Sequence, residues 1–261
     1  MIKRCSYQAR VVAFAQWDCV YLCVSSNRME TLTKIFENGT TLTSHNGQLL
    51  FIEWLPNQLK NFYCYDPSTG LQPTTEETFS KAIGGEHFSK IERHLADKIH
   101  NYSSTSGLNG EKYFCNFQSG IIKGFDAAGN KIYEWDTNRD EIGPGHAIYD
   151  IAFEPPHFMW LAFPTGQTIA KVSLEAKEEV FRIGDYTFQE IYEPLSYPES
   201  FFITDSDLFI SNMGSGKLFR LDLQTLLLEL DRTFPDRLWE YIKIGETEYV
   251  KLDKAIYKVE P

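Results

Sequence analysis

Three residues have side chains that could carry chemistry and lie close to predicted strands. His146 precedes a predicted strand at 147–153, Glu199 precedes another at 200–204, and His45 lies in a short Asn-Gly-containing segment. A histidine and a carboxylate that converge could bind a ligand or serve a hydrolase. If they do not converge, the same side chains make structural hydrogen bonds or are solvated. We take His146 and Glu199 as weak catalytic candidates, and His45, His146 and Glu199 as candidate binding residues.

Patterns that identify a more specific chemistry are missing from the sequence. The glycine-rich segment 214–216 is not followed by the Gly-Lys-Ser/Thr of a phosphate-binding loop, and no Gly-x-Ser-x-Gly or His-Glu-x-x-His motif occurs. The five cysteines show neither zinc-site nor redox spacing, and Cys19 and Cys23 are interpreted as small buried hydrophobic residues. The sequence therefore predicts no cofactor and no metal site from these groups.

A repeat indicates which elements must position the candidate residues. The segments 113–126 and 209–222 align without gaps, and 160–173 fits between them at a step of about fifty residues. The first two segments share four identities: Asn116/Asn212, Ser119/Ser215, Gly120/Gly216 and Asp126/Asp222. Each copy predicts a strand, a glycine-containing turn and a second strand that ends at an Asp able to accept hydrogen bonds from its own turn.

These repeats predict an all-β fold. A further strand precedes the copies, so each unit is a small antiparallel meander that must stack against its neighbours, and radial stacking leaves only short edges. Weaker copies at 20–36 and 49–66 and three C-terminal strands within 239–259 bring the count to a six-bladed β-propeller, with five or seven blades less favoured. We expect a single domain over 1–261, closed when the N-terminal strand 2–7 pairs with the C-terminal blade.

One segment, at 74–100, departs from the strand pattern. Thr75 predicts a helix N-cap, and apolar residues recur at helical spacing from Phe88 to Ile99. This helical insertion between the second and third predicted blades either covers a rim of the propeller or forms part of a binding surface.

The stretch 146–223 resembles the six-bladed propellers of the NHL and SMP-30/gluconolactonase type. The segment 208–222 is similar to their repeated element, which closes on Gly-x-Leu-x-Arg-x-Asp. The gluconolactonase-like members hold a divalent cation at the channel mouth with Glu, Asn and Asp. The resemblance places Glu199 where that Asp is expected, but Gly145-His146-Ala147 and Ala9-Arg10-Val11 at the other two places.

Composition limits the classes of partner. The net charge of −11 opposes nucleic-acid binding, which needs a basic surface. The start of the chain has no signal-peptide pattern, and no apolar stretch is long enough for a membrane helix, so we expect a cytoplasmic protein. The leading hypothesis is a non-catalytic module that binds a protein partner through channel-mouth loops and the helical insertion. The alternatives are a divergent gluconolactonase-like hydrolase, which would need a divalent cation, and a small-ligand sensor.

Overall fold

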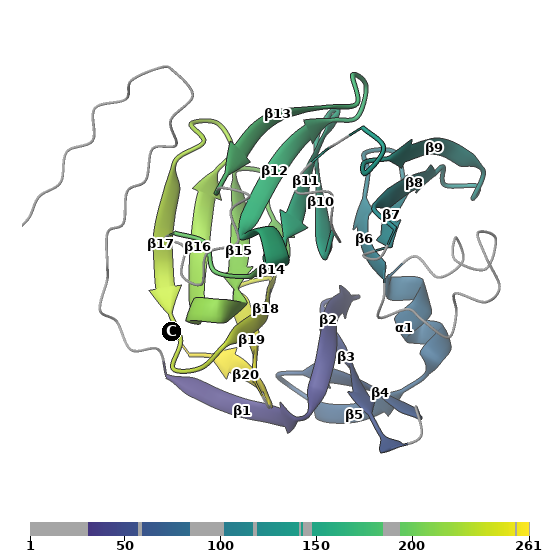
Figure 1. Ribbon diagram of the computed structural model, residues 1–261. Coiled ribbons are helices and arrows are strands. Elements are labelled where there is room, and N and C mark those ends of the chain that lie inside the picture. Colours follow the sequence, from purple (N-terminus) through teal and green to yellow (C-terminus); the bar gives the residue numbers. More distant parts are fainter. Residues whose placement is uncertain are drawn as a thin grey trace, which may run out of the picture.

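The described part of the chain folds into five antiparallel sheets arranged around a common centre, as the computed structural model shows (Figure 1). The structure describes residues 31–56, 59–83, 102–116, 119–140, 142, 148–184, 194–253 and 255–260. Each sheet has four strands, and consecutive strands pair except where the ring closes. The fold is therefore an all-β propeller, as the repeat predicts. No helix within these ranges is long and apolar enough to cross a membrane.

The strands of each sheet follow one another outward from the centre of the ring (Figure 1). The first sheet contains β2 (Gly39–His45), β3 (Gln48–Trp54), β4 (Lys60–Asp66) and β5 (Gly70–Thr74). The second contains β6 (Tyr102–Ser106), β7 (Lys112–Asn116), β8 (Ile121–Phe125) and β9 (Lys131–Asp136). The third contains β10 (Asp150–Glu154), β11 (Phe158–Phe163), β12 (Thr168–Ser173) and β13 (Glu178–Ile183). The fourth contains β14 (Pro198–Ile203), β15 (Asp207–Asn212), β16 (Lys217–Asp222) and β17 (Leu228–Thr233).

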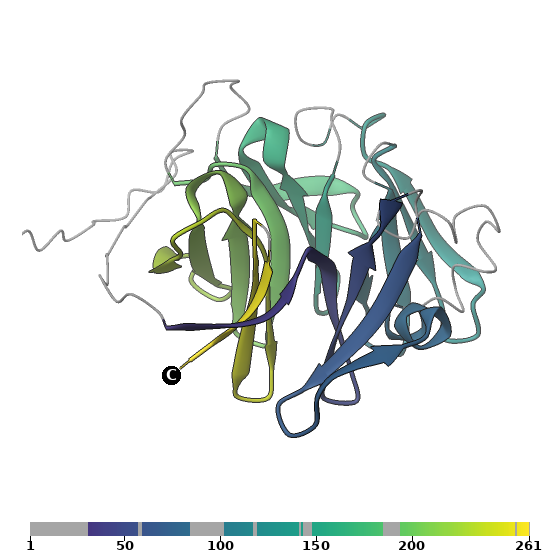
Figure 2. The ribbon, with the colours of Figure 1, turned by 90° about the horizontal axis from the view of Figure 1, so that it is seen from below.

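The last sheet joins the two ends of the described chain. It contains β18 (Leu238–Ile244), β19 (Thr247–Leu252), β20 (Ala255–Val259) and, as its outer strand, β1 (Leu32–Glu37). β1 pairs with β20 from Leu32 opposite Val259 to Glu37 opposite Ala255. Figure 2 shows this strand running along the C-terminal sheet before the chain enters β2.

This closure corrects the predicted blade count from six to five. The sequence repeat treats 20–36 as a blade of its own, but its end, Leu32–Glu37, completes the C-terminal sheet instead. The error arises because a closing strand has the same alternating pattern as a strand that begins a new blade. The segment 2–7, predicted to close the ring, lies outside the described residues.

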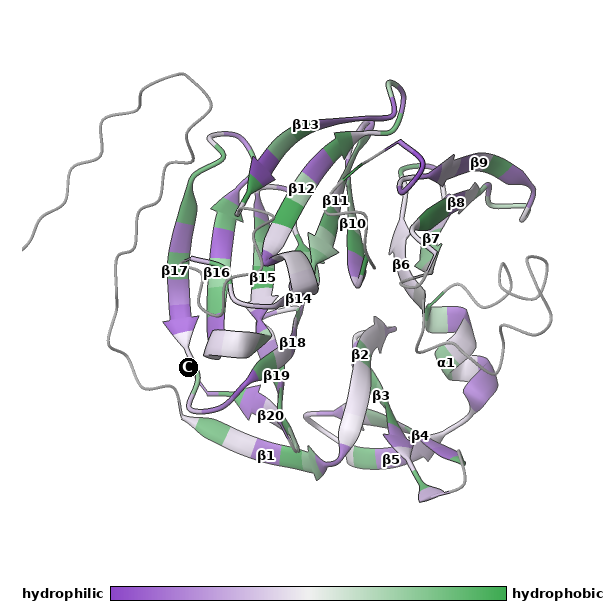
Figure 3. Ribbon diagram, in the orientation of Figure 1, coloured by the Kyte–Doolittle hydropathy of each residue, from purple (hydrophilic) through white to green (hydrophobic). Residues whose placement is uncertain are grey.

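The burial pattern explains why these segments form stacked sheets. The middle strand β11 is almost wholly buried, because sheets pack on both of its faces, whereas the outer strand β9 is mostly exposed. Figure 3 shows the same contrast, with hydrophobic residues along β11 and hydrophilic residues along β9. Fully buried large side chains such as Trp135, Trp160 and Phe219 fill the wedges between sheets.

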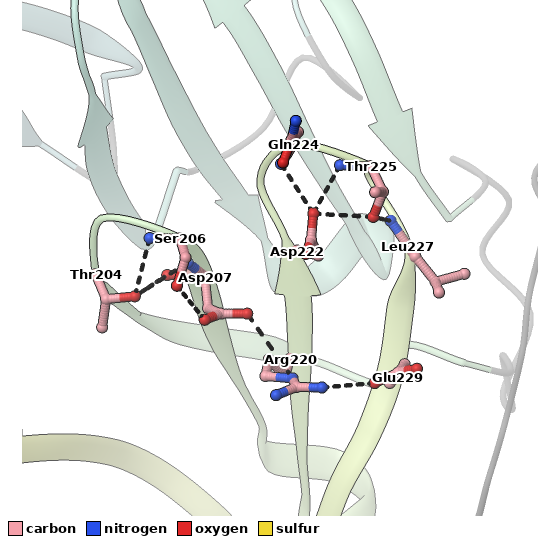
Figure 4. Close-up of polar contacts among 9 residues, drawn as sticks. All are labelled: Thr204, Ser206, Asp207, Arg220, Asp222, Gln224, Thr225, Leu227 and Glu229. Carbon is pink, nitrogen blue, oxygen red and sulfur yellow. Dashed lines mark hydrogen bonds and ion pairs between the residues drawn. The ribbon is translucent and has the colours of Figure 1, made fainter.

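The Asp that ends two of the three predicted repeats, 113–126 and 209–222, has the role expected of it. The Asp222 carboxylate accepts hydrogen bonds from the backbone N–H groups of Gln224 and Thr225 at 3.0 and 2.7 Å (Figure 4). Asp126 accepts one from Asn130 in the equivalent turn. The recurring Asn212 is fully buried, and its amide donates to the Ser215 hydroxyl at 2.7 Å. Asn212 therefore has the structural role that the sequence indicates; the side chain of Asn116 lies outside the described residues.

The first part of the predicted helical insertion is a helix. Helix α1 spans Glu76–Ala82, and Thr75 caps it by accepting a hydrogen bond from the Thr78 N–H at 3.1 Å. Within the part of the insertion that the structure describes, which ends at residue 83, this short element is the only helix. Residues 84–100 lie outside the described ranges. The Phe79 side chain is fully buried against β3 and β4 of the first sheet.

Candidate functional site

Three carboxylates come from the innermost strands of three successive sheets. Asp150 is the first residue of β10, Glu199 the second of β14 and Glu240 the third of β18. These strands line the centre of the ring next to one another (Figure 1). All three lie near the start of their strands, and Glu199 interacts electrostatically with both Asp150 and Glu240, so the three groups lie near one another. We call this set, with Tyr149 and Tyr197, the channel-mouth site.

Bulges lie at or next to two of these side chains, Glu199 and Glu240. The pairing of β14 with β15 shifts between Pro198 and Ser200, so Glu199 is the extra residue of that bulge. A second shift lies between Leu238 and Glu240 in β18. A bulge inserts an unpaired residue and redirects its side chain. The bulge therefore sets the direction of the Glu199 side chain, which does not follow the regular alternation of β14.

Asp150 joins the inner strands of three sheets. Its carboxylate accepts hydrogen bonds from the Ser103 hydroxyl of β6 and from the Phe201 N–H of β14, the latter at 2.6 Å. Burial raises the pKa of Asp150 to about 6, although these hydrogen bonds oppose the shift. Because these hydrogen bonds connect the inner strands of three sheets, they favour a structural role for Asp150.

Glu240 makes the corresponding link between the last sheet and the first. Its two carboxylate oxygens accept hydrogen bonds from the N–H groups of Thr41 at 2.9 Å and Leu42 at 2.6 Å. Both N–H groups belong to a bulge in β2, where Thr41 has a φ of 56°. Burial raises the pKa of Glu240, and the charge of Lys251 lowers it.

Glu199 differs from its two neighbours because its carboxylate has no hydrogen-bond partner among the residues that the structure describes. Burial, reinforced by the negative charges of Glu240 and Asp150, raises its pKa to about 7. The side chain is half-buried, so part of it remains exposed. A half-buried carboxylate with a strongly raised pKa is a candidate functional group.

Two tyrosines stand beside Glu199 at the surface. Tyr149 precedes β10 and Tyr197 precedes β14, and they are 38% and 42% exposed. Burial raises the pKa of Tyr149, and the charges of Glu199 and Tyr197 add to the shift, which places the three side chains near one another. An exposed aromatic pair beside a carboxylate can pack on an alkyl chain and attract a positive charge.

The structure brings together only part of the set predicted from sequence. Glu199 lies in the channel-mouth site, and His146 lies outside the described residues. His45 is the last residue of β2, whereas the part of β2 that contacts Glu240 is Thr41–Leu42. Three further residues of extended strand correspond to roughly 10 Å, so His45 is not brought to Glu199.

Sequence reasoning missed Asp150 and Glu240. The sequence does contain a signal for Asp150. This residue lies about one repeat before Glu199, and a tyrosine precedes each of them, directly before Asp150 and two residues before Glu199. Glu240 follows Trp239 within an alternating strand and has no comparable signal. Its role depends on the bulge in β2, which the sequence does not indicate.

The described residues do not supply the cation site that the gluconolactonase-like resemblance implies. Of the three matching places, only that of Glu199 is described, and no group of three His, Cys, Asp or Glu side chains within the described ranges could hold a metal ion. The oxygens of Asp150 and Glu240 are engaged by hydroxyl and backbone donors. We therefore derive no chemical step through a metal.

Comparison with protein-family models finds no match, and comparison with curated proteins finds no sequence match. A streptogramin B lyase structure is similar in fold, with a TM-score of 0.54 and 12% identity over 88% of this chain and 97% of that one. A structural genomics protein of unknown function from Bacteroides thetaiotaomicron gives a TM-score of 0.51 and 14% identity over 85% of this chain and 58% of that one. These similarities show the β-propeller fold.

A virginiamycin B lyase from Staphylococcus aureus gives a TM-score of 0.47 at 15% identity. The match covers 85% of this chain and 65% of the lyase, so this chain spans less than two thirds of that protein's length.

Proposed function

We propose that this propeller is a non-catalytic module that binds a protein partner, and that the partner inserts a lysine or arginine side chain at the channel-mouth site. The single observation that carries this proposal is that Glu199 lies near two exposed tyrosines and has a carboxylate with no hydrogen-bond partner among the described residues. A basic side chain would supply the missing counter-charge and hydrogen-bond donors.

The surroundings of Glu199 favour a cation over other ligands. Asp150 and Glu240 add negative potential, and the chain as a whole has a net charge of −11, which would steer a basic partner toward the protein. Tyrosine is enriched at the centres of protein interfaces, where its ring buries area and its hydroxyl stays hydrated. A nucleic acid or an anionic membrane surface would be repelled by the same charges.

Helix α1 provides a second surface for the same partner. Its Glu77 and Lys81 form an exposed ion pair at 2.8 Å, and Glu76 is also exposed. These charges can be altered without disturbing Phe79, which is buried beneath the helix. Changing them therefore tests the contribution of α1 without removing the element itself.

The test uses the full chain as bait, with partners quantified by mass spectrometry. We expect a defined partner that is retained by the wild type and by Glu229→Gln, and lost with Glu199→Gln or Tyr197→Ala. Glu229 is a matched control because it lies on β17 and pairs with Arg220. A synthetic peptide containing the partner's lysine should bind, and the same peptide with acetylated lysine should not. Partners captured equally by all variants would contradict the proposal.

A second candidate is a divergent gluconolactonase-like hydrolase or a small-ligand sensor, because a carboxylate with a pKa of about 7 can exchange a proton at neutral pH. The hydrolase requires a divalent cation, so Ca²⁺, Mg²⁺ or Zn²⁺ at sub-millimolar concentration should raise the melting temperature. It should also open a lactone in a reaction that Glu199→Gln abolishes. A sensor would show stabilisation by a small molecule without turnover.

A further inference from the structure

Tyr197 of the channel-mouth site has a backbone conformation that its own chemistry opposes. Its φ of 55° lies in the left-handed region, where a bulky side chain is uncommon. Pro198 follows it directly, and a residue before proline is biased toward extended backbone instead. An unfavourable conformation of this kind persists only where the surrounding structure fixes it. The contacts of the segment 194–197 therefore identify what holds Tyr197.

Two backbone hydrogen bonds join this segment to the tip of the hairpin between β15 and β16. The N–H of Met213 donates to the Tyr197 carbonyl at 2.9 Å, and that of Gly214 donates to the Ser196 carbonyl at 2.8 Å. A Cβ atom at residue 214 would overlap Ser196, so the close approach of the two backbones requires glycine there. The hairpin tip therefore supports the segment that carries Tyr197.

One buried side chain, Asn212, adds three hydrogen bonds to this junction. Its Oδ1 atom accepts a hydrogen bond from the Ser196 N–H at 2.8 Å. Its amide nitrogen donates to the Pro194 carbonyl at 3.4 Å and to the Ser215 hydroxyl at 2.7 Å. Because Asn212 is fully buried, these hydrogen bonds are shielded from bulk water. The side chain therefore fixes the backbone directly before Tyr197.

The hairpin itself does not need this amide. In the third sheet, the aligned repeat has Phe163 at the position of Asn212. The hairpin that follows Phe163 has a short 3-10 helix at Pro164–Gly166, as the other hairpin has at Met213–Ser215. The turn therefore forms without the amide, which leaves the segment before Tyr197 as the structure that depends on Asn212.

We propose that Asn212 is the positioning residue of the channel-mouth site. By fixing Ser196, it holds Tyr197 in the left-handed conformation and so sets where the exposed ring lies relative to Glu199. The hydrogen bonds of the buried amide offset the free energy that the unfavourable φ requires. The use of this ring in binding a basic side chain rests on the proposed function, whereas the conformation of Tyr197 does not.

A pair of substitutions at Tyr197 tests the conformation. Tyr197→Gly and Tyr197→Ala both remove the ring, but glycine tolerates a positive φ, whereas alanine is the more stable residue in ordinary backbone. In the otherwise wild-type chain, we expect the glycine variant to melt about 1–3 °C above the alanine variant. With Asn212→Ala added to both, this order should disappear or reverse. An alanine variant that melts higher in the wild-type background, or an order unchanged by Asn212→Ala, would overturn the proposal.

A control variant separates the contact with Ser196 from a general loss of stability. Ser215→Ala removes one acceptor of the Asn212 amide and leaves the hydrogen bond to Ser196, so the order of the Tyr197 pair should persist. If Asn212→Ala does not fold, Asn212→Ser, whose side chain is one bond shorter, takes its place in both backgrounds.

Nitration of tyrosines with tetranitromethane, followed by peptide mass spectrometry, measures the exposure of the Tyr197 ring while the protein is folded. Tyr197 is 42% exposed, so its release in Asn212→Ala should raise its nitration rate by up to about twofold. Tyr241 is 3% exposed and reports global unfolding, so its rate should not change. Equal acceleration of both tyrosines would show that Asn212 serves stability alone, and an unchanged Tyr197 rate would also contradict the positioning role.

An oligolysine peptide connects this test with the proposed function. The wild type should bind it more tightly than Glu199→Gln does, and Asn212→Ala should lose that advantage. If the wild type and Glu199→Gln bind it equally, while the Tyr197 pair and the nitration rates behave as expected, the proposed function is wrong and the positioning role stands. If Asn212→Ala binds it as tightly as the wild type and Glu199→Gln does not, Asn212 does not position the site.

Discussion

The carboxylate of Asp150 accepts a 2.6 Å hydrogen bond from the backbone N–H of Phe201, which lies in the inner strand of the next sheet. The same side chain also reaches the Ser103 hydroxyl of the preceding sheet. One residue therefore fixes three inner strands relative to one another. The position of Glu199, two residues before Phe201, depends on this link.

Replacement of Asp150 by alanine should destabilise the ring. The Phe201 N–H and the Ser103 hydroxyl would lose their acceptor in a confined site, which costs about 1–3 kcal/mol per unsatisfied group. Urea unfolding measures the loss in free energy of unfolding. Asp222→Ala is the control, because it removes a carboxylate that serves only an exposed turn. A smaller loss for Asp150→Ala than for Asp222→Ala would contradict the assigned role.

Glu199→Gln should stabilise the protein above neutral pH. The folded-state pKa of Glu199, about 7, is higher than its ordinary value, so the folded state favours the protonated form. The contribution of Glu199 to the free energy of unfolding is complete below its unfolded-state pKa and is lost as pH rises through about 7. The wild type should therefore be less stable than the variant at pH 8, by up to roughly 3 kcal/mol, and similar to it near pH 4. Equal stability at both pH values would show that the Glu199 pKa is not raised.

Binding of a basic partner should strengthen as pH rises. Only the ionised Glu199 carboxylate attracts a cation, and with a pKa of about 7 the ionised fraction increases roughly tenfold between pH 6 and pH 8. Titration calorimetry with the partner's lysine peptide should show this change in affinity for the wild type and not for Glu199→Gln. Affinity that falls over the same range would exclude a cationic ligand at this residue.

Gly39→Ala should weaken the closure of the ring. A Cβ atom at Gly39 would overlap the Ile256 side chain and lie 3.1 Å from Phe51, in the core between the last sheet and the first. Overpacking of this kind costs typically about 1–3 kcal/mol. Thermal unfolding measures the effect, and Ser44→Ala, at an exposed position of the same strand, is the control. An unchanged melting temperature would mean that Ile256 moves aside without cost.

The sequence predicts the sheets better than it predicts how they close. The repeats around Trp160 and Phe209 and the turns ended by Asp126 and Asp222 identify β7, β8, β11, β12, β15 and β16, because these depend on local alternation and turn chemistry. The number of sheets depends on where Leu32–Glu37 pairs. The local pattern of this segment does not decide whether it begins a separate blade or completes the C-terminal sheet.

The candidate site is predictable only in part for a related reason. Glu199 is found because it stands directly before a strand of a recognisable repeat. The positions of Asp150 and Glu240 depend on contacts with β6, β14 and β2, which are distant in sequence, and on bulges that the residues do not signal. The prediction that His45 joins Glu199 fails because the strand pattern of 39–45 does not reveal which end of β2 faces the carboxylates.

The position of β1 has a consequence for synthesis. This strand is synthesised before any of the five described sheets is complete, yet its partner β20 follows all the other described strands. Until β20 has been synthesised, the nascent chain carries an edge with no strand to pair with, a hazard for association between chains. Closure of the ring therefore requires a pairing between strands that are distant in sequence, and pairings of this kind form slowly.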